Sequence, residues 1–504
     1  MKKLDKKLAS NATFLFLDWF FVTLLNFVYW SVAGKTLLPE QYGLVSTSIN
    51  LANLLSGISL LGLNTTLWKL IPEYLEKKQG ERAKELIQFS LKTVFISNII
   101  IILALLLFSN TVTEILKIPT TVVFITGINL LIVSLWTQSS SILMGTQEMK
   151  KIALTDVIGQ TVKILISTTL IFLGFKYFGP LIGFMIGVLI VTALRIPFKF
   201  LGKIKKEVLD KKQILLGFAV PAFIASLAWL VFTSGQYILL TALKGLEVTG
   251  IFTVALLLTS PIVSVPNVLS GALFPIISQL SVNHNAKKQQ VHLIKMVFRY
   301  VLFFSIPAAL FLILFSNHVI LIFSRPEYLP ASSLFAILAL ASIIYGIGNV
   351  FNSTLYSLGK PIAQRNIIIA TVALFFLLAV PLTVFLSARG MCIAYLLSVS
   401  FLSIVSYKYV KKILPISIPW GSLKKIAVAS LLSFLFLYTI ANPVPNIYFA
   451  IVFCIIAGMI YLEILLLLKF YTKQDIAILK SILEKSPIFR KQILGLIDVF
   501  SKLV

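Results

Sequence analysis

Apolar residues fall along this chain in blocks of about 20, separated by short polar segments. The blocks show none of the alternation between polar and apolar positions that the strands of a membrane barrel require. A helix of about 20 apolar residues is long enough to cross a hydrocarbon layer of about 30 Å, so we predict an all-α polytopic membrane protein with about 14 transmembrane helices. The predicted spans cover residues 13–33, 44–64, 88–108, 121–141, 154–174, 179–197, 214–236, 250–273, 299–316, 332–354, 366–386, 391–407, 426–441 and 447–468.

Composition agrees with a membrane location. Of the 504 residues, 58% are hydrophobic and only 12% are charged, whereas soluble proteins carry about 25% charged residues. A single soluble core stops growing at about 250–300 residues, so it could not bury this much apolar sequence. The first apolar block follows four lysines within residues 1–10 and precedes no small-residue cleavage site. We therefore expect it to remain as the first span and not to be removed as a signal peptide.

The net charge of +26 would suggest a nucleic-acid partner in a soluble protein. If the N-terminus is cytoplasmic, however, only six of the 44 lysines and arginines fall in outer loops, and Lys163 alone falls within a span. The positive-inside rule then places both termini in the cytoplasm. The charge is explained by topology and by attraction to anionic lipids, so no nucleic-acid partner is expected. The six outer residues are Lys35, Lys117, Lys176, Lys244, Arg325 and Arg389.

Short matches between the two halves of the chain indicate an internal repeat. Because six spans separate the copies, both have the same orientation in the membrane. Parallel repeats around a site near the bilayer midplane are a transporter architecture. The matched glycines are Gly43 with Gly250, Gly145 with Gly359, and Gly179 with Gly390.

The repeat sets the predicted domain boundaries. Two bundles of six helices are expected on either side of a basic cytoplasmic connector, followed by two further spans. In the C-terminal tail, apolar residues recur at helical spacing, which predicts amphipathic helices on the inner leaflet. The predicted domains are 1–198 (N-lobe), 199–213 (connector), 214–410 (C-lobe), 411–469 (spans 13 and 14) and 470–504 (tail).

Residues 37–43 (LLPEQYG), a second span that ends in Gly-Leu at 62–63, and PEY at 72–74 form a distinctive opening. With the glycine starts of spans six and twelve, this pattern resembles the polysaccharide-biosynthesis or lipid-linked oligosaccharide flippases. They belong to the superfamily that includes multidrug and toxin exporters and the peptidoglycan-precursor flippase. The resemblance covers about residues 10–470. It implies alternating access between two lobes, with a lipid-linked oligosaccharide of the polyprenyl or dolichyl phosphate type as the substrate.

Ionisable residues deep in a span are functional candidates, because each costs about 2.5–3.5 kcal/mol to insert. Lys163 lies deep in the fifth span, and Asp156 and Gln160 share its helix face. This face is predicted to line a cavity, where Lys163 could meet a phosphate; a structural ion pair is the alternative. Asp18 in the first span could balance the charge of Lys163 or couple transport to a cation, and Asp156 is a second candidate for these roles. Arg195 and Arg299, near span ends, are interpreted as headgroup anchors.

Amides and aromatic residues also form stripes at helical spacing in several spans. Such stripes either hydrogen-bond neighbouring helices together or line a common wet cavity that suits sugar hydroxyls and ring faces. Both interpretations stay open. The remaining candidates for substrate binding are Asn50, Asn53, Trp229, Gln236, Asn267, Tyr345, Asn349 and Asn352.

Several enzyme classes lack support in the sequence. No phosphate-binding loop for ATP is found, the three histidines show no zinc spacing, and outer-face carboxylates are too scattered for acid–base catalysis. We expect a transporter without cofactor or metal, whose partners are membrane lipids and possible polysaccharide-assembly enzymes. The alternatives are a cation-coupled multidrug or toxin exporter and, less favoured, an integral-membrane glycosyltransferase or polymerase.

Overall fold

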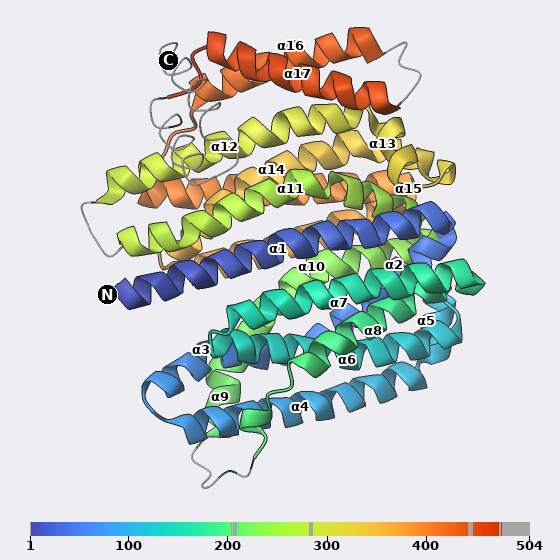
Figure 1. The fold of residues 1–504 in the computed structure, drawn as a ribbon, viewed down its shortest axis with the longest axis vertical. Helices are drawn as coiled ribbons and strands as arrows, with labels where there is room; N and C mark the ends of the chain where they lie inside the picture. The colour runs from blue at the N-terminus through green and yellow to red at the C-terminus, as the bar shows by residue number, and fades with distance from the viewer. Residues whose placement is uncertain are drawn as a thin grey trace. The chain divides into compact units, whose positions relative to one another are not determined.

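The computed structural model describes residues 2–202, 204, 209–281, 286–441, 447–472 and 475 (Figure 1). Within these ranges every extended regular element is a helix, which confirms the predicted all-α class. Nine of the described helices are long and apolar enough to cross a membrane, or ten if the bent pair Pro39–Ser59 and Leu63–Glu76 is one span. The chain is therefore a multi-pass membrane protein, and the count of about 14 spans stays a prediction.

The chain forms two compact units. Unit 1 comprises Met1–Leu258, Ile320–Leu334 and Arg365–Ser398, and unit 2 comprises Thr259–Val319, Phe335–Gln364 and Val399–Val504. The sequence-based lobes stay predictions. The predicted amphipathic tail beyond residue 475 lies outside the described residues, as do residues 203 and 205–208 of the connector.

Unit 1 holds the N-terminal helices, and unit 2 holds most of the C-terminal ones. In chain order, unit 1 contains α1 (Lys2–Thr36), α2 (Pro39–Ser59), α3 (Leu63–Glu76), α4 (Gly80–Leu107), α5 (Ser109–Leu116), α6 (Thr120–Gly145), α7 (Met149–Leu170), α8 (Phe178–Leu194), α9 (Lys211–Ile214) and α10 (Val220–Lys244), with π-helices at Ile171–Phe175 and Leu215–Ala219 and 3-10 turns at Phe198–Phe200 and Pro326–Ala331. Unit 2 contains α12 (Lys287–Leu314), α16 (Trp420–Ala441) and α17 (Ile447–Leu467), while α11 (Leu246–Ser281), α13 (Ser316–Phe323), α14 (Ser332–Ser357) and α15 (Pro361–Ile413) contribute to both.

Small residues set the close packing of α7 against α8 in unit 1. Gly179, Gly183 and Gly187 recur at every fourth position of α8, so they share one face. A Cβ atom at Gly183 would lie 2.1 Å from Ser167 Oγ, and one at Gly187 would lie 2.7 Å from Lys163 Cβ. Small residues allow the backbones of membrane helices to approach closely. The glycines of α8 therefore fix the position of Lys163 on α7.

The repeat-related glycines Gly43 and Gly250 pack against each other where α2 and α11 begin. A Cβ atom at Gly43 would lie 1.8 Å from the carbonyl oxygen of Leu246, and one at Gly250 would lie 2.0 Å from that of Pro39. Each glycine thus meets the residue four positions before its counterpart. This reciprocal contact is the kind that a two-fold axis between equivalent segments produces.

Backbone turns also follow the repeat. Lys176 (φ 47°, ψ −126°) and Ser387 (φ 53°, ψ −138°) adopt the same left-handed conformation, each three residues before its matched glycine, Gly179 or Gly390. Ser387 breaks α15 into two helices, at the place where the sequence predicts the boundary between two spans. The turns after α7 and within α15 are therefore equivalent.

One of the three sequence matches is two residues out of register. The alignment of Gly145 with Gly359 is wrong, because the residue with the matching backbone is Gln147 (φ 61°), not Gly145, against Gly359 (φ 74°). After Gln147 the amide of Glu148 donates to a carbonyl five residues back, and after Gly359 the amide of Lys360 does the same, at 2.9 and 3.0 Å. This is the Schellman type of helix end, in which glycine is common but not obligatory.

In unit 2, α12 packs against α16, and α16 packs against α17. Asp475, beyond the end of α17, accepts hydrogen bonds from Arg299 and Tyr300 of α12 and from the backbone amide of Thr472 at 2.7 Å. Arg299 is therefore bound to a carboxylate of its own chain, and its interpretation as a headgroup anchor is wrong. The contact ties the segment after α17 to α12.

Candidate functional site

A cavity of about 190 Å³ lies inside unit 1, among α2, α6, α7 and α8. The predicted polar face of α7 lines it, since Asp156, Gln160 and Lys163 all border the cavity, and Asn53 of α2 joins them. These four are sequence candidates that the structure brings together. The other lining residues are Val133, Trp136, Gly159, Phe184, Gly187, Val188 and Val191.

Lys163 is the one basic residue among the described residues that line this cavity, and it is only 3% exposed. Its Nζ donates to Asn26 Oδ1 at 3.0 Å and lies 4.2 Å from the ring centre of Tyr29. Tyr29 is in turn fixed by a 2.9 Å hydrogen bond from its hydroxyl to the carbonyl of Pro180. Among the residues that the structure describes, no carboxylate lies within ion-pair distance of Lys163. An ammonium carries three donors, so Lys163 retains the capacity to bind an anion.

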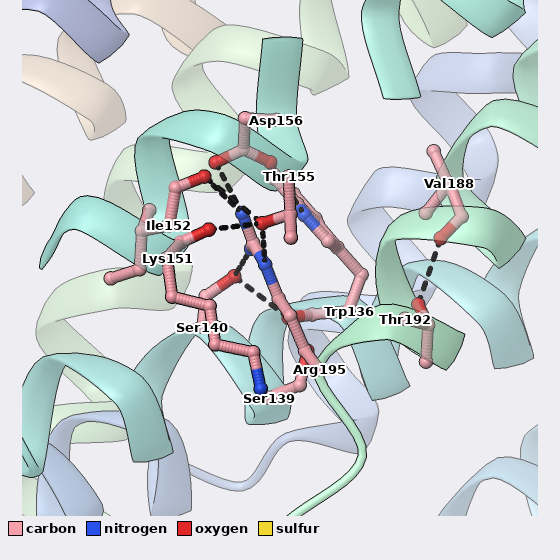
Figure 2. Close-up of polar contacts among 10 residues, drawn as sticks. All are labelled: Trp136, Ser139, Ser140, Lys151, Ile152, Thr155, Asp156, Val188, Thr192 and Arg195. Carbon is pink, nitrogen blue, oxygen red and sulfur yellow. Dashed lines mark hydrogen bonds and ion pairs between the residues drawn. The ribbon is translucent and has the colours of Figure 1, made fainter. Parts of the chain in front are cut away.

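Asp156 is paired with Arg195, which is 1% exposed and follows the last residue of α8 (Figure 2). Arg195 Nη2 lies 2.7 Å from Asp156 Oδ2. The same Nη2 donates to the carbonyl of Ile152 at 2.8 Å, while Nε donates to Thr155 Oγ1 at 2.7 Å and Nη1 donates to Ser140 Oγ at 2.6 Å. The guanidinium is thus bound on every side by α6 and α7. The interpretation of Arg195 as a headgroup anchor is therefore wrong.

The pairing of Asp156 matters for the electrostatics of the cavity. Trp136 Nε1 donates to Asp156 Oδ1 at 3.3 Å, so both carboxylate oxygens have partners. Arg195 neutralises Asp156 and leaves Lys163 as a cation without a paired carboxylate at the lining. The signal that could have predicted this pair is Asp156 itself, because a carboxylate within a span needs a cation at the same depth, and Arg195 lies at the matching end of the next span.

Asp18 of α1 lies close enough to Asp156 and Arg195 to interact with both charges. Its Oδ1 is buried without a hydrogen-bond partner. Within the described residues, Asp18 thus interacts with the charges of that pair without a hydrogen bond or ion pair to it, whereas Asn26 and Tyr29, also on α1, contact Lys163.

Three further candidates of unit 1 do not line this cavity. Asn50 donates to the carbonyl of Ser46 in its own helix at 2.9 Å. Gln236 is 7% exposed, and its Nε2 donates to the carbonyl of Thr233 one turn earlier at 3.0 Å. Trp229 is 39% exposed and packs beside Phe232.

Four candidates lie in unit 2, on α11 and α14. Asn349 Nδ2 donates to Asn267 Oδ1 at 2.9 Å. Tyr345 and Asn352 are buried, at 7% and 8% exposure. In the described part of the chain, no group of three or more His, Cys, Asp or Glu residues could hold a metal ion. The candidates of unit 1 that line the cavity could bind an anion through Lys163. The candidates of unit 2 are uncharged and offer hydrogen bonds.

Three solved structures of transport proteins have a similar fold. The lipid II flippase MurJ in an inward closed conformation superimposes with a TM-score of 0.73 at 17% identity, over 90% of this chain and 98% of that chain. An inward-facing multidrug resistance transporter of the MATE family superimposes with a TM-score of 0.60 at 15% identity, over 78% of this chain and 94% of that chain. The MATE multidrug transporter DinF-BH superimposes with a TM-score of 0.58 at 16% identity, over 81% of this chain and 95% of that chain. The TM-scores show a shared fold, and at these identities the likeness extends to the fold alone.

A comparison with curated protein sequences finds no match. Residues 8–281, more than half of the chain, match the family described as polysaccharide biosynthesis protein. The matched region contains the opening at residues 37–43 and all of the residues that line the cavity of unit 1. On this evidence the chain belongs to the polysaccharide biosynthesis protein family.

Proposed function

We propose that the chain is a flippase that moves a lipid-linked oligosaccharide from the cytoplasmic to the outer leaflet of the cytoplasmic membrane. It would act by alternating access, with both termini in the cytoplasm, and supply precursors for a cell-surface polysaccharide or glycoconjugate. The hydrophilic headgroup would cross through polar parts of the protein while the lipid tail stays in the bilayer.

The observation that carries this proposal is Lys163. It borders the cavity of unit 1 with its ammonium bound to a neutral amide and to the face of an aromatic ring. A buried cation without an opposite charge is costly in a membrane protein, so an anionic ligand would relieve that cost. The phosphate that joins lipid and glycan is the anion such a substrate supplies. Family membership in polysaccharide biosynthesis and the fold of a lipid flippase support the same substrate class.

The test is glycan export in cells whose own copy of the gene is deleted. Lys163→Gln removes the charge but keeps a hydrogen-bonding end, and we expect export to fall at least tenfold, because a hydrogen-bonded charge contributes about 1.5–3 kcal/mol. Lys163→Arg keeps the charge with a different geometry and should retain part of the activity. The matched control is Lys92→Gln, since Lys92 is an exposed lysine on a membrane helix away from the cavity. Full export by Lys163→Gln at normal protein level would refute the proposed phosphate contact.

A cation-coupled exporter is the second candidate, favoured by the buried, unpartnered Oδ1 of Asp18. That function predicts the opposite order of effects. Asp18→Asn would abolish transport because a neutral amide cannot bind a coupling cation, while Lys163→Gln would be tolerated. If Asp18→Asn instead costs less than Lys163→Gln, the flippase proposal stands.

A further inference from the structure

We infer that α11 and α14 of unit 2 form a sugar-binding surface made of two rungs, which we name the ladder. The first rung is the amide pair Asn267–Asn349, and the second is the aromatic pair Phe274–Tyr356. The inference rests on the proposed function, because it assigns the uncharged sugar rings of the same substrate class to these residues.

The two rungs repeat at the same spacing on both helices. Asn349 Nδ2 donates to Asn267 Oδ1 at 2.9 Å, and the rings of Phe274 and Tyr356 stack with 5.3 Å between centres and 27° between planes. Seven residues separate the rungs on each helix, which is two turns or about 10 Å. The helices therefore run parallel here, and both rungs lie on one face of the pair.

A close contact between the helices brings the amides together. A Cβ atom at Gly346 of α14 would lie 2.6 Å from Cγ of Pro266 in α11. Gly346 is one turn before Asn349, and Pro266 directly precedes Asn267. Because glycine lets α14 approach α11 at this level, the short side chains of two asparagines can reach each other.

The ladder leaves polar and aromatic groups available. Asn267 is exposed, and Tyr356 is 50% exposed. Between the rungs, each helix also carries one buried polar atom without a hydrogen-bond partner: Ser270 Oγ on α11 and Asn352 Oδ1 on α14. Their residues are only 2% and 8% exposed. These two atoms add unused hydrogen-bonding capacity between the rungs, next to the exposed groups of Asn267 and Tyr356.

Sugar rings match these groups better than other parts of the substrate do. Amides both donate and accept, as sugar hydroxyls do, and an exposed aromatic ring offers its apolar face to the C–H face of a pyranose. The ladder contains no charged residue, so it does not suit the phosphate. Hydrogen bonding between helices would explain the amide pair alone, but not the exposed aromatic ring of Tyr356 that stacks in the second rung.

The experiment measures the lipids that co-purify with the full-length protein from cells that make the native polysaccharide. Mass spectrometry gives two quantities: total bound polyprenyl or dolichyl phosphates and pyrophosphates, and the fraction of them that carries sugar. For the double variant Asn267→Ala/Tyr356→Leu we expect the ratio of sugar-bearing to sugar-free lipid to fall about tenfold, since it loses one hydrogen-bonding and one stacking group. Total bound lipid should change little.

Two variants serve as controls. Tyr356→Phe keeps the ring and should keep the wild-type ratio. Tyr409→Leu makes the same change as Tyr356→Leu at another exposed tyrosine of unit 2, and it should also leave the ratio unchanged.

The outcomes separate the ladder from the proposed function. If the wild-type protein binds no polyprenyl or dolichyl lipid, the flippase proposal fails, and the ladder fails with it. If the wild type binds sugar-bearing lipid but the double variant keeps the same ratio, only the ladder is refuted and the amides join the helices. The ladder would also be refuted if Tyr409→Leu lowered the ratio of sugar-bearing to sugar-free lipid as much as the double variant does, because the effect would then not be specific to the ladder.

Discussion

The cavity of unit 1 and the ladder of unit 2 present polar groups inside the membrane in opposite ways. The cavity encloses charged groups: Lys163 is almost fully buried, and the nearby pair of Asp156 and Arg195 is locked by hydrogen bonds from two helices. The ladder is uncharged and partly open, and a single hydrogen bond joins its amides. The difference lies in how much bonding capacity is left: the Asp156–Arg195 pair is held by hydrogen bonds within the protein, whereas the amides of the ladder keep donors and acceptors that their single mutual bond does not use.

The largest expected effect is on the support of the charged cavity. Arg195→Leu leaves the carboxylate of Asp156 buried and unpaired, and we expect it to lower the free energy of unfolding by about 3–5 kcal/mol. Thermal unfolding of the purified protein in detergent measures the change. The double variant Arg195→Leu/Asp156→Leu should recover most of the loss, because it leaves no unpaired charge. If the double variant is no more stable than Arg195→Leu, the ion pair is not the reason for the effect.

A smaller effect is expected from the close packing behind Lys163. In Gly187→Ala the new methyl group would lie 2.7 Å from both the carbonyl oxygen of Gly159 and Cβ of Lys163. Overpacking of this kind costs about 1–3 kcal/mol of unfolding free energy. The matched control is Gly421→Ala, where the added atom meets nothing within 4 Å. Equal melting temperatures for the two variants would contradict the role of Gly187 in fixing Lys163.

The smallest effect is expected at the ladder. Asn349→Ala removes the hydrogen bond to Asn267, and such bonds between membrane helices average about 0.6 kcal/mol. The matched control is Asn98→Ala, because Asn98 is fully buried and donates to Ser134 Oγ at 2.6 Å. Asn98→Ala should destabilise more, by up to about 1.7 kcal/mol, because its bond is fully buried. A loss at Asn349 as large as that at Asn98 would mean that the ladder is part of the structural core, and the comparison between the two regions would fail.

The sequence predicts the helical class and the polar face of α7 well, because both depend on local periodicity. Asp156, Gln160 and Lys163 are separated by one and two helical turns, and all three line one cavity. The stripe containing Asn349 is also visible in the sequence as a face of one helix.

Pairings between distant segments could not be predicted in the same way. Arg195 ends a span, where most arginines contact lipid headgroups, and only the return of α8 across α7 brings it to Asp156. The partner of Asn349 depends on the close approach at Gly346, which periodicity within one helix does not encode. A search that matched buried charges by their depth in the membrane would have found the first pair, and the second required the structure.

The equivalent turns at Lys176 and Ser387 keep one backbone conformation with two different side chains. Lysine and serine have little chemistry in common, and a positive φ is unfavourable for both. The two residues nevertheless have similar φ and ψ angles. Gln147 and Gly359 show the same divergence of side chain without divergence of backbone. Duplication of a gene for a half-length chain would leave this pattern, in which matched turns keep their backbone conformation while their residues differ. The reciprocal contact of Gly43 with Gly250 is the contact that two copies of a half-length chain would make about a two-fold axis.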